Sequence, residues 1–195
     1  MKFILGTKIG MSQVFDEKGN VIPITLIEAG PCPVTQAKTK DKDGYEAVQI
    51  GFVDKNKHIK KTEKGKEFKY LKEFDSADYK AGDKIDVSIF QEGDMVKVAG
   101  MTKGKGFAGA VKRWGFHGRP KTHGTKHELR QVGSIGSTFP ERVVKGKKMP
   151  GRMGFRRKTI KNLKIVKVDL ENNLIAVKGA VPGRTGSLLE IRSIK

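Results

Sequence analysis

The feature that most constrains the fold of this chain is a long segment in which positive charge has almost no countercharge. Residues 102–162 contain 17 lysines and arginines but only two acids, Glu128 and Glu141. The same segment holds 11 of the chain's 24 glycines, and its apolar content lies below the average of the chain. Such a segment repels itself and lacks the side chains for a core, so it is expected to order against a polyanion. We therefore predict a nucleic acid as its partner, and folded RNA in particular.

The remainder of the chain carries 23 basic and 19 acidic residues and is dominated by strand patterns. Short β-branched or alternating runs are separated by turn residues such as Asp16–Asn20 and Glu171–Asn173, whereas helical periodicity is hard to find. This spacing predicts a mainly β fold, a barrel or a sandwich, rather than a βαβ fold. The predicted strands cover residues 11–15, 21–27, 34–38, 45–53, 85–89, 95–98, 165–170 and 174–178.

A lysine-rich stretch, residues 55–74, interrupts the strand pattern. It contains eight lysines and three glutamates and ends in a cluster of aromatic and apolar residues. One interpretation is a short helix that packs its apolar edge on the barrel. The other, which we favour, is a solvated charged excursion, because runs of charge usually lie in solvent.

The length of 195 residues is sufficient for a substantial core without covalent cross-links. The single cysteine, Cys32, excludes an internal disulfide framework and indicates a reducing compartment. No apolar run is long enough for a signal peptide or a membrane span, so we predict a soluble, cytosolic protein with no membrane partner.

Signatures of enzymes are weak. Residues 104–109 spell G-x-G-x-x-G, but the glycine-broken basic run that follows cannot form the crossover helix of a dinucleotide site, and the other kinase motifs are missing. His117, His123 and His127 do not have the spacing of a metal site, and Cys32 lies between two prolines without a nearby histidine. We predict no catalytic residue, no cofactor, no metal and no small-molecule substrate.

Five motifs together resemble the bacterial large-subunit ribosomal protein L3 family. They occur in the order of the family and extend over nearly the whole chain. They are residues 6–15 (GTKIGMSQVF), 103–114 (KGKGFAGAVKRW), 133–136 (GSIG), 145–154 (KGKKMPGRMG) and 177–183 (VKGAVPG).

The resemblance implies a translation-protein-like β-barrel made by residues 1–101 and 163–195, with a lysine-rich insertion at about 55–80. Residues 102–162 would then be an extended loop that penetrates the ribosomal RNA toward the peptidyl transferase centre. It further implies a structural role, binding to large-subunit ribosomal RNA beside neighbouring ribosomal proteins, early action in subunit assembly, and location in the cytoplasm within the ribosome. Composition alone would also suit a free nucleic-acid-binding or chromatin-like factor.

The candidate interface combines the cations of the basic segment with side chains that can stack on bases. The expected tip of the loop, nearest the peptidyl transferase centre, is Gly136, Ser137, Thr138 and Phe139, where the glutamine found in some relatives is missing. The expected RNA-binding residues are Lys103, Lys105, Lys112, Arg113, Trp114, Phe116, His117, Arg119, Lys121, His123, Lys126, Arg130, Arg142, Lys145, Lys147, Lys148, Arg152, Arg156, Arg157 and Lys158.

The role of Trp114 has two interpretations. Its indole stacks on or wedges between bases, or it joins Phe107 and Phe116 in a small apolar cluster that anchors the root of the loop. The sequence favours stacking, because glycine and basic residues flank the tryptophan.

Overall fold

The computed structural model describes residues 2–76 and 78–194, and the chain forms two compact units. The first, here called the barrel unit, contains the residues up to Thr102 and those from Arg157 onward. The second, here called the extension unit, is Lys103–Arg156. Strands far outnumber helices among the described residues, which confirms the predicted mainly β class.

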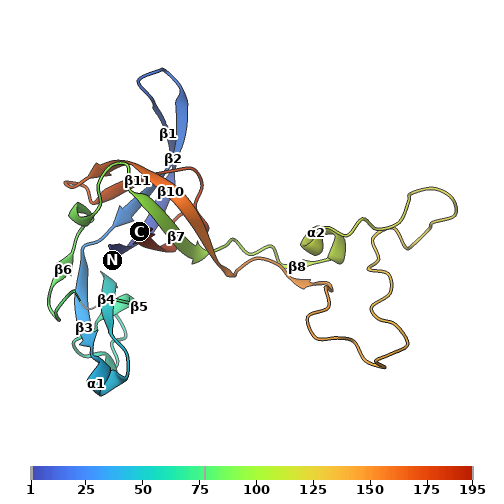
Figure 1. Ribbon diagram of the computed structural model, residues 1–195, viewed down its shortest axis with the longest axis horizontal. Helices are drawn as coiled ribbons and strands as arrows, with labels where there is room; N and C mark the ends of the chain where they lie inside the picture. Colours follow the sequence, from blue (N-terminus) through green and yellow to red (C-terminus); the bar gives the residue numbers. More distant parts are fainter. Residues whose placement is uncertain (1, 77, 195) are drawn as a thin grey trace. The chain divides into compact units, whose positions relative to one another are not determined.

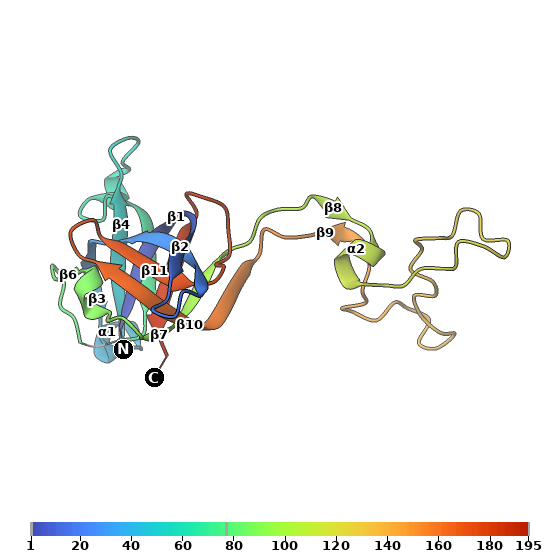
Figure 2. The same ribbon diagram turned by 90° about the horizontal axis from the view of Figure 1, so that it is seen from above.

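Within the described residues, six antiparallel strands close the barrel (Figures 1 and 2). The order around the barrel is β1-β12-β7-β10-β11-β2, so strands from both ends of the chain pair in one closed sheet. The predicted hairpins at residues 11–27 and 165–178 are present as β1–β2 and β10–β11. The bounds are β1 (Phe3–Phe15), β2 (Val21–Ala29), β7 (Met95–Met101), β10 (Arg157–Asp169), β11 (Leu174–Lys178) and β12 (Leu188–Ser193).

A second sheet, with strand order β5-β4-β3-β6, shares one hydrophobic core with the barrel. Phe3, Ile4 and Leu5 of β1 are all fully buried. Because successive side chains of a strand point to opposite faces, this run shows that β1 is covered on both sides at its start. The remaining elements of this unit are β3 (Cys32–Lys38), α1 (Lys40–Asp43), β4 (Ala47–Asp54), η1 (Lys61–Glu63), β5 (Phe68–Phe74), β6 (Lys84–Ile85) and η2 (Val87–Ile89).

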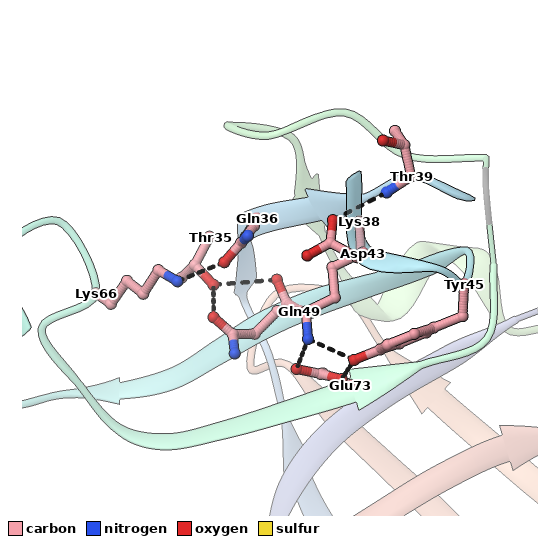
Figure 3. A network of polar contacts seen from close by, with 9 residues as sticks. All are labelled: Thr35, Gln36, Lys38, Thr39, Asp43, Tyr45, Gln49, Lys66 and Glu73. Atoms are coloured by element: carbon pink, nitrogen blue, oxygen red, sulfur yellow. Dashed lines mark hydrogen bonds and ion pairs between the residues drawn. The ribbon is translucent and has the colours of Figure 1, made fainter. Parts of the chain in front are cut away.

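A polar network links strands β3, β4 and β5 of this second sheet (Figure 3). Lys38 Nζ lies 2.8 Å from Glu73 Oε1, and the Tyr45 hydroxyl donates to Glu73 Oε2 at 2.9 Å. These contacts raise the pKa of Lys38 above its usual range and lower that of Glu73, in each case mainly through the hydrogen bond between the two side chains. Lys66 also donates to the Gln36 side chain, so the network holds one lysine of the charged stretch against β3.

Two sequence-based predictions in this region are wrong. Residues 85–89 do not form one strand: β6 ends at Ile85, and a 3₁₀ turn, with three residues per turn, brings Val87 and Phe90 to the same side, where both are buried in the core. The favoured interpretation of residues 55–74 as a solvated charged excursion is wrong for Phe68–Phe74, which is strand β5, paired with β4. It does describe residues 55–67, which are mostly exposed and contain the 3₁₀ turn η1 in place of the alternative, a short helix that packs an apolar edge on the barrel.

The expected end of the basic segment also shifts. The extension unit ends at Arg156, and residues 157–160 pair with β7 as the first part of β10, where Arg157 lies opposite Met101. A strand can carry many cations when its outward side chains reach solvent, so charge alone did not reveal this boundary. The segment is also not wholly irregular, because it contains β8 (Phe107–Ala108), α2 (Ala110–Trp114) and β9 (Gly151–Arg152).

Candidate nucleic-acid interface

The extension unit begins and ends in a narrow two-stranded ribbon. Phe107 lies opposite Arg152 in the antiparallel pair β8–β9. Two further hydrogen bonds lengthen this pairing: Lys105 N–H donates to the Met153 carbonyl, and Met153 N–H donates to the Gly106 carbonyl, both at 2.9 Å. The ribbon therefore brings together residues that are more than 40 positions apart in the sequence.

The single helical turn α2 follows the ribbon directly. It begins after Gly109 and ends at Trp114, and the left-handed backbone of the capping residue Gly115 lets its N–H donate to the Val111 carbonyl at 3.0 Å. Arg113 Nη1 and Trp114 Nε1 both donate to the carbonyl of Met149, at 2.6 Å and 2.8 Å. One backbone carbonyl thus accepts two side-chain donors and fixes α2 against the chain that leads into β9.

Trp114 is surrounded by cations and remains partly accessible. The Arg113 guanidinium lies 4.9 Å from the ring centroid of Trp114, and Lys148 Nζ lies 5.9 Å away. The indole is 38% exposed, whereas Phe107 is 81% exposed. The exposed Phe107 does not take part in the alternative apolar cluster with Trp114 and Phe116, and the Met149 carbonyl accepts the hydrogen bond that holds the indole. Stacking of its free surface on a base stays a prediction.

The long loop between α2 and β9 is held by turns rather than by a core. Arg119 N–H donates to the Leu129 carbonyl at 3.1 Å, and the Arg119 guanidinium pairs with Glu128, also at 3.1 Å. At the expected tip, Ser137 Oγ donates to the Phe139 carbonyl at 2.7 Å. The Phe139 side chain is 76% exposed, so this apolar ring lies open to a partner.

The extension unit has strong positive charge and almost no buried apolar surface. Its 54 residues contain 14 lysines and arginines against Glu128 and Glu141, and only Ala108 and Ala110 are buried. Low apolar burial and uncompensated charge mean that the conformation of this unit gains little from its own packing.

The predicted RNA-binding residues fall into three places. The ribbon and its flanks hold Lys103, Lys105, Arg152 and Arg156, and α2 holds Lys112, Arg113 and Trp114. The loop after α2 holds the remainder up to Lys148, whose Nζ lies 5.9 Å from the ring centroid of Trp114. Arg157 and Lys158 belong instead to β10 of the barrel unit.

Features that would indicate a catalytic or metal centre are missing from the described parts of the chain. Residues 104–109 lie in the antiparallel ribbon, so they do not form the parallel strand–helix turn of a dinucleotide site. No cluster of three metal-ligating side chains occurs in residues 2–76 and 78–194. Burial raises the pKa of the Cys32 thiol to about 12, which removes the thiolate that a nucleophile requires. No described helix has the length and apolar character needed to cross a bilayer.

The sequence-based prediction missed a second concentration of positive charge, on the barrel unit. Lys97, Lys161 and Arg192 line one hollow together with Arg157. The available signal was the alternation of basic and apolar residues in these strands, but which strands become neighbours is decided only by the closed barrel.

A mainly β unit interrupted by a basic, glycine-rich and poorly packed segment has the clustered positive charge typical of nucleic-acid-binding proteins. Comparison with known proteins makes the class specific. The family profile described as "Ribosomal protein L3" matches residues 47–171.

Full-length relatives agree with this match. The large ribosomal subunit protein uL3 of Thermosipho africanus is 52% identical over 207 aligned positions, which cover 100% of this chain and 99% of the relative. Proteins of the same name from Thermotoga maritima and Carboxydothermus hydrogenoformans are 51% and 50% identical, over 100% and 98% of this chain and 98% and 96% of the relatives. The chain belongs to the ribosomal protein L3 family.

The alignment with the Thermosipho protein is longer than the 195 residues of this chain, so that relative has residues which this chain lacks.

Proposed function

We propose that the protein is a structural constituent of the bacterial large ribosomal subunit that binds large-subunit ribosomal RNA directly and acts early in subunit assembly. It would work in the cytoplasm, within the ribosome, beside other large-subunit proteins. The observation that carries this proposal is the extension unit, with 14 cations, two acids and two buried residues. RNA phosphates supply the countercharge that the unit lacks, and its glycines permit close approach of the backbone.

The first test is the salt dependence of binding to a large-subunit ribosomal RNA fragment. Each phosphate that a cation neutralises lowers the slope of log affinity against log salt by ~0.7–0.9. We expect a steep slope, flattened by ~1–2 units when Lys147 and Lys148 are both replaced by alanine. The matched control replaces Lys18 and Lys42, two exposed lysines of the barrel unit, and should change the slope less.

Co-sedimentation separates this role from that of a free nucleic-acid-binding factor. We expect the protein to sediment with large subunits and to leave them only in high salt. Equal affinity for ribosomal RNA and arbitrary duplexes, without co-sedimentation, would contradict a ribosomal role. An affinity that does not respond to salt would contradict the phosphate-based interface.

We further propose that the tip of the extension, Gly136–Phe139, lies closer to the peptidyl transferase centre than any other part of the chain. Small residues suit a reversal of the chain in a narrow RNA passage, and the exposed Phe139 ring offers a surface to nucleotides. The tip contains no acid, base or metal ligand. Ribosomes with Phe139→Ala should therefore still react with puromycin at a substantial rate, with altered drug sensitivity; complete loss of the reaction in fully assembled subunits would contradict a structural role.

A further inference from the structure

We propose that a basic pocket on the outer face of the barrel unit binds one phosphate group of structured RNA, as a built site separate from the extension unit. The pocket is lined by Lys97, Arg157, Thr159, Lys161, Glu190 and Arg192, around Ala99. The RNA partner rests on the proposed function, whereas recognition of phosphate rests on the pocket itself.

Strand register places these residues on one face of three neighbouring strands. Ala99 of β7 lies opposite Glu190 of β12 on one side and Thr159 of β10 on the other. Two residues along β7, Lys97 lies opposite Arg192. Because side chains alternate along a strand, the intervening Val98 and Ile191 point inward and are fully buried, so the polar set points outward.

Glu190 organises the cations around it. Glu190 is only 8% exposed. Its carboxylate pairs with Arg157, with Arg192 at 3.8 Å and with Lys72 of β5 at 3.5 Å. One carboxylate cannot neutralise three cations. An arginine also has five N–H donors in a planar fork, so an arginine bound to Glu190 keeps donors for a second anion.

The Arg192 guanidinium is held in place from a second side. Its Cζ atom lies 4.5 Å from the ring centroid of Phe74, which is fully buried. The Arg192 side chain is 24% exposed, much less than that of Arg157, at 53%. Arg192 is therefore preorganised, and an anion that binds it does not first have to order a flexible side chain.

The hollow has the size and polarity for a phosphate group. Its volume is about 260 Å³, enough for a phosphate with several waters. Ala99 lines the pocket with a short side chain that leaves its space open, and Thr159 adds a hydroxyl donor beside the cations. Lys97 and Lys161 bring the lining cations to four against the single carboxylate of Glu190. A purely structural ion pair would not require this excess, whereas binding of a phosphate would use it.

The first experiment titrates inorganic phosphate into the full-length free protein and follows its amide resonances by NMR. Localised, saturable shifts at Ala99, Thr159 and Glu190 are expected, weakened at least severalfold in the Lys97→Ala/Lys161→Ala variant. Shifts spread evenly over all the lysine-rich surfaces would overturn the built site. This result does not depend on RNA, so it separates failure of the pocket from failure of the proposed function.

The second experiment measures binding to a large-subunit ribosomal RNA fragment at several salt concentrations. The Lys97→Ala/Lys161→Ala variant should flatten the salt slope by about one unit, the share of one phosphate contact, and lower affinity more than the Lys18→Ala/Lys42→Ala control. Arg157→Lys keeps the charge but loses the planar fork, and it should also weaken binding.

Controls decide between the remaining explanations. Equal melting temperatures of the variants and the parent protein would exclude unfolding, and Lys161→Ala alone serves if the double variant is unstable. Equal effects of the pocket and control variants would overturn the proposal. If polyglutamate competed with RNA at equal charge concentration, the pocket would be a site for an acidic protein, and the proposal would be overturned.

Discussion

The ring of Phe3 stacks on the ring of Phe74, with centroids 4.5 Å apart and an angle of 10° between the planes. Phe3 begins the first barrel strand, and Phe74 ends the strand that closes the lysine-rich stretch. Both side chains are almost completely buried, and the Tyr79 ring contacts Phe3 edge-on at 5.5 Å. This contact joins the barrel and the second sheet into one core.

Replacing Phe74 with alanine should destabilise the whole barrel unit. Loss of a buried phenylalanine removes its transfer free energy and leaves a cavity, at a cost of ~3–5 kcal/mol. The measurement is chemical unfolding followed by circular dichroism. Phe15→Ala is the matched control, because Phe15 is 64% exposed, and it should change the free energy of unfolding by less than ~0.5 kcal/mol. Similar losses for both variants would contradict the assigned core.

The Lys38–Glu73 pair should make stability depend on pH at the acidic end. The pKa of Glu73 is lowered below 4.5 in the folded protein, chiefly by the hydrogen bond from Lys38, so its contribution is present above pH 4.5 and is lost as the pH falls through the lowered value. The pKa of Lys38 is raised, so its contribution persists below its usual value of 10.5 and is lost only as the pH rises through the raised value.

The measurement compares the free energy of unfolding of the parent protein with that of Glu73→Gln. We expect a difference that is constant near neutral pH and shrinks below pH 4.5. Glu17→Gln, at the exposed β1–β2 turn, is the control. Its difference from the parent protein should not shrink in this way below pH 4.5. A difference in the free energy of unfolding that grows on acidification would contradict the prediction.

Gly154 should be indispensable to the root of the extension unit. Its backbone has a φ of +73°, and a Cβ atom there would lie 2.1 Å from the carbonyl oxygen of Lys103. Gly154→Ala should therefore open the β8–β9 ribbon and speed amide exchange at Lys105 and Met153 by at least ~10-fold, while exchange in the barrel core stays unchanged.

The matched control for that substitution is Gly146→Ala. Gly146 has a φ of +84°, but a methyl group at this position would meet nothing within 4 Å, so the variant carries the backbone strain without the collision. It should leave exchange at the ribbon close to that of the parent protein. Equal opening in both variants would mean that strain, and not the close approach to Lys103, decides the structure of the root.

Trp114→Phe should loosen α2 locally without affecting the barrel unit. The variant keeps an aromatic ring beside Arg113 but loses the Nε1 donor to the Met149 carbonyl, a hydrogen bond worth ~1 kcal/mol. We expect faster amide exchange at Arg113 and Gly115 and an unchanged melting temperature. Phe107→Leu, at an 81% exposed position, is the control. A fall in melting temperature would show that Trp114 supports the barrel.

RNA binding by the same variants bears on the second role of Trp114. If the indole also stacks on a base, Trp114→Phe should retain most of the affinity and Trp114→Ala should lose ~1–3 kcal/mol. Equal losses in both variants would indicate that positioning through Met149, rather than stacking, is what RNA binding requires.

Much of this protein was accessible from local patterns. Alternation and turn residues predicted the β1–β2 and β10–β11 hairpins, because both depend on contacts between residues close in the sequence. The density of charge in residues 102–162 predicted a segment without a core of its own, because apolar content limits burial wherever the chain lies. The family resemblance rested on the order of motifs, which is also a property of the sequence alone.

The tertiary structure decided which distant residues meet. Closure of the barrel placed Lys97, Arg157 and Arg192, from three separate strands, around one pocket, where both arginines pair with Glu190. Core packing selected strand β5 over a helix, because the Phe74 ring is buried against Phe3, more than 70 residues away. The Met149 carbonyl, not a neighbouring aromatic ring, fixed Trp114. Each outcome depends on long-range register and on satisfying buried groups, and local propensity carries no information about either.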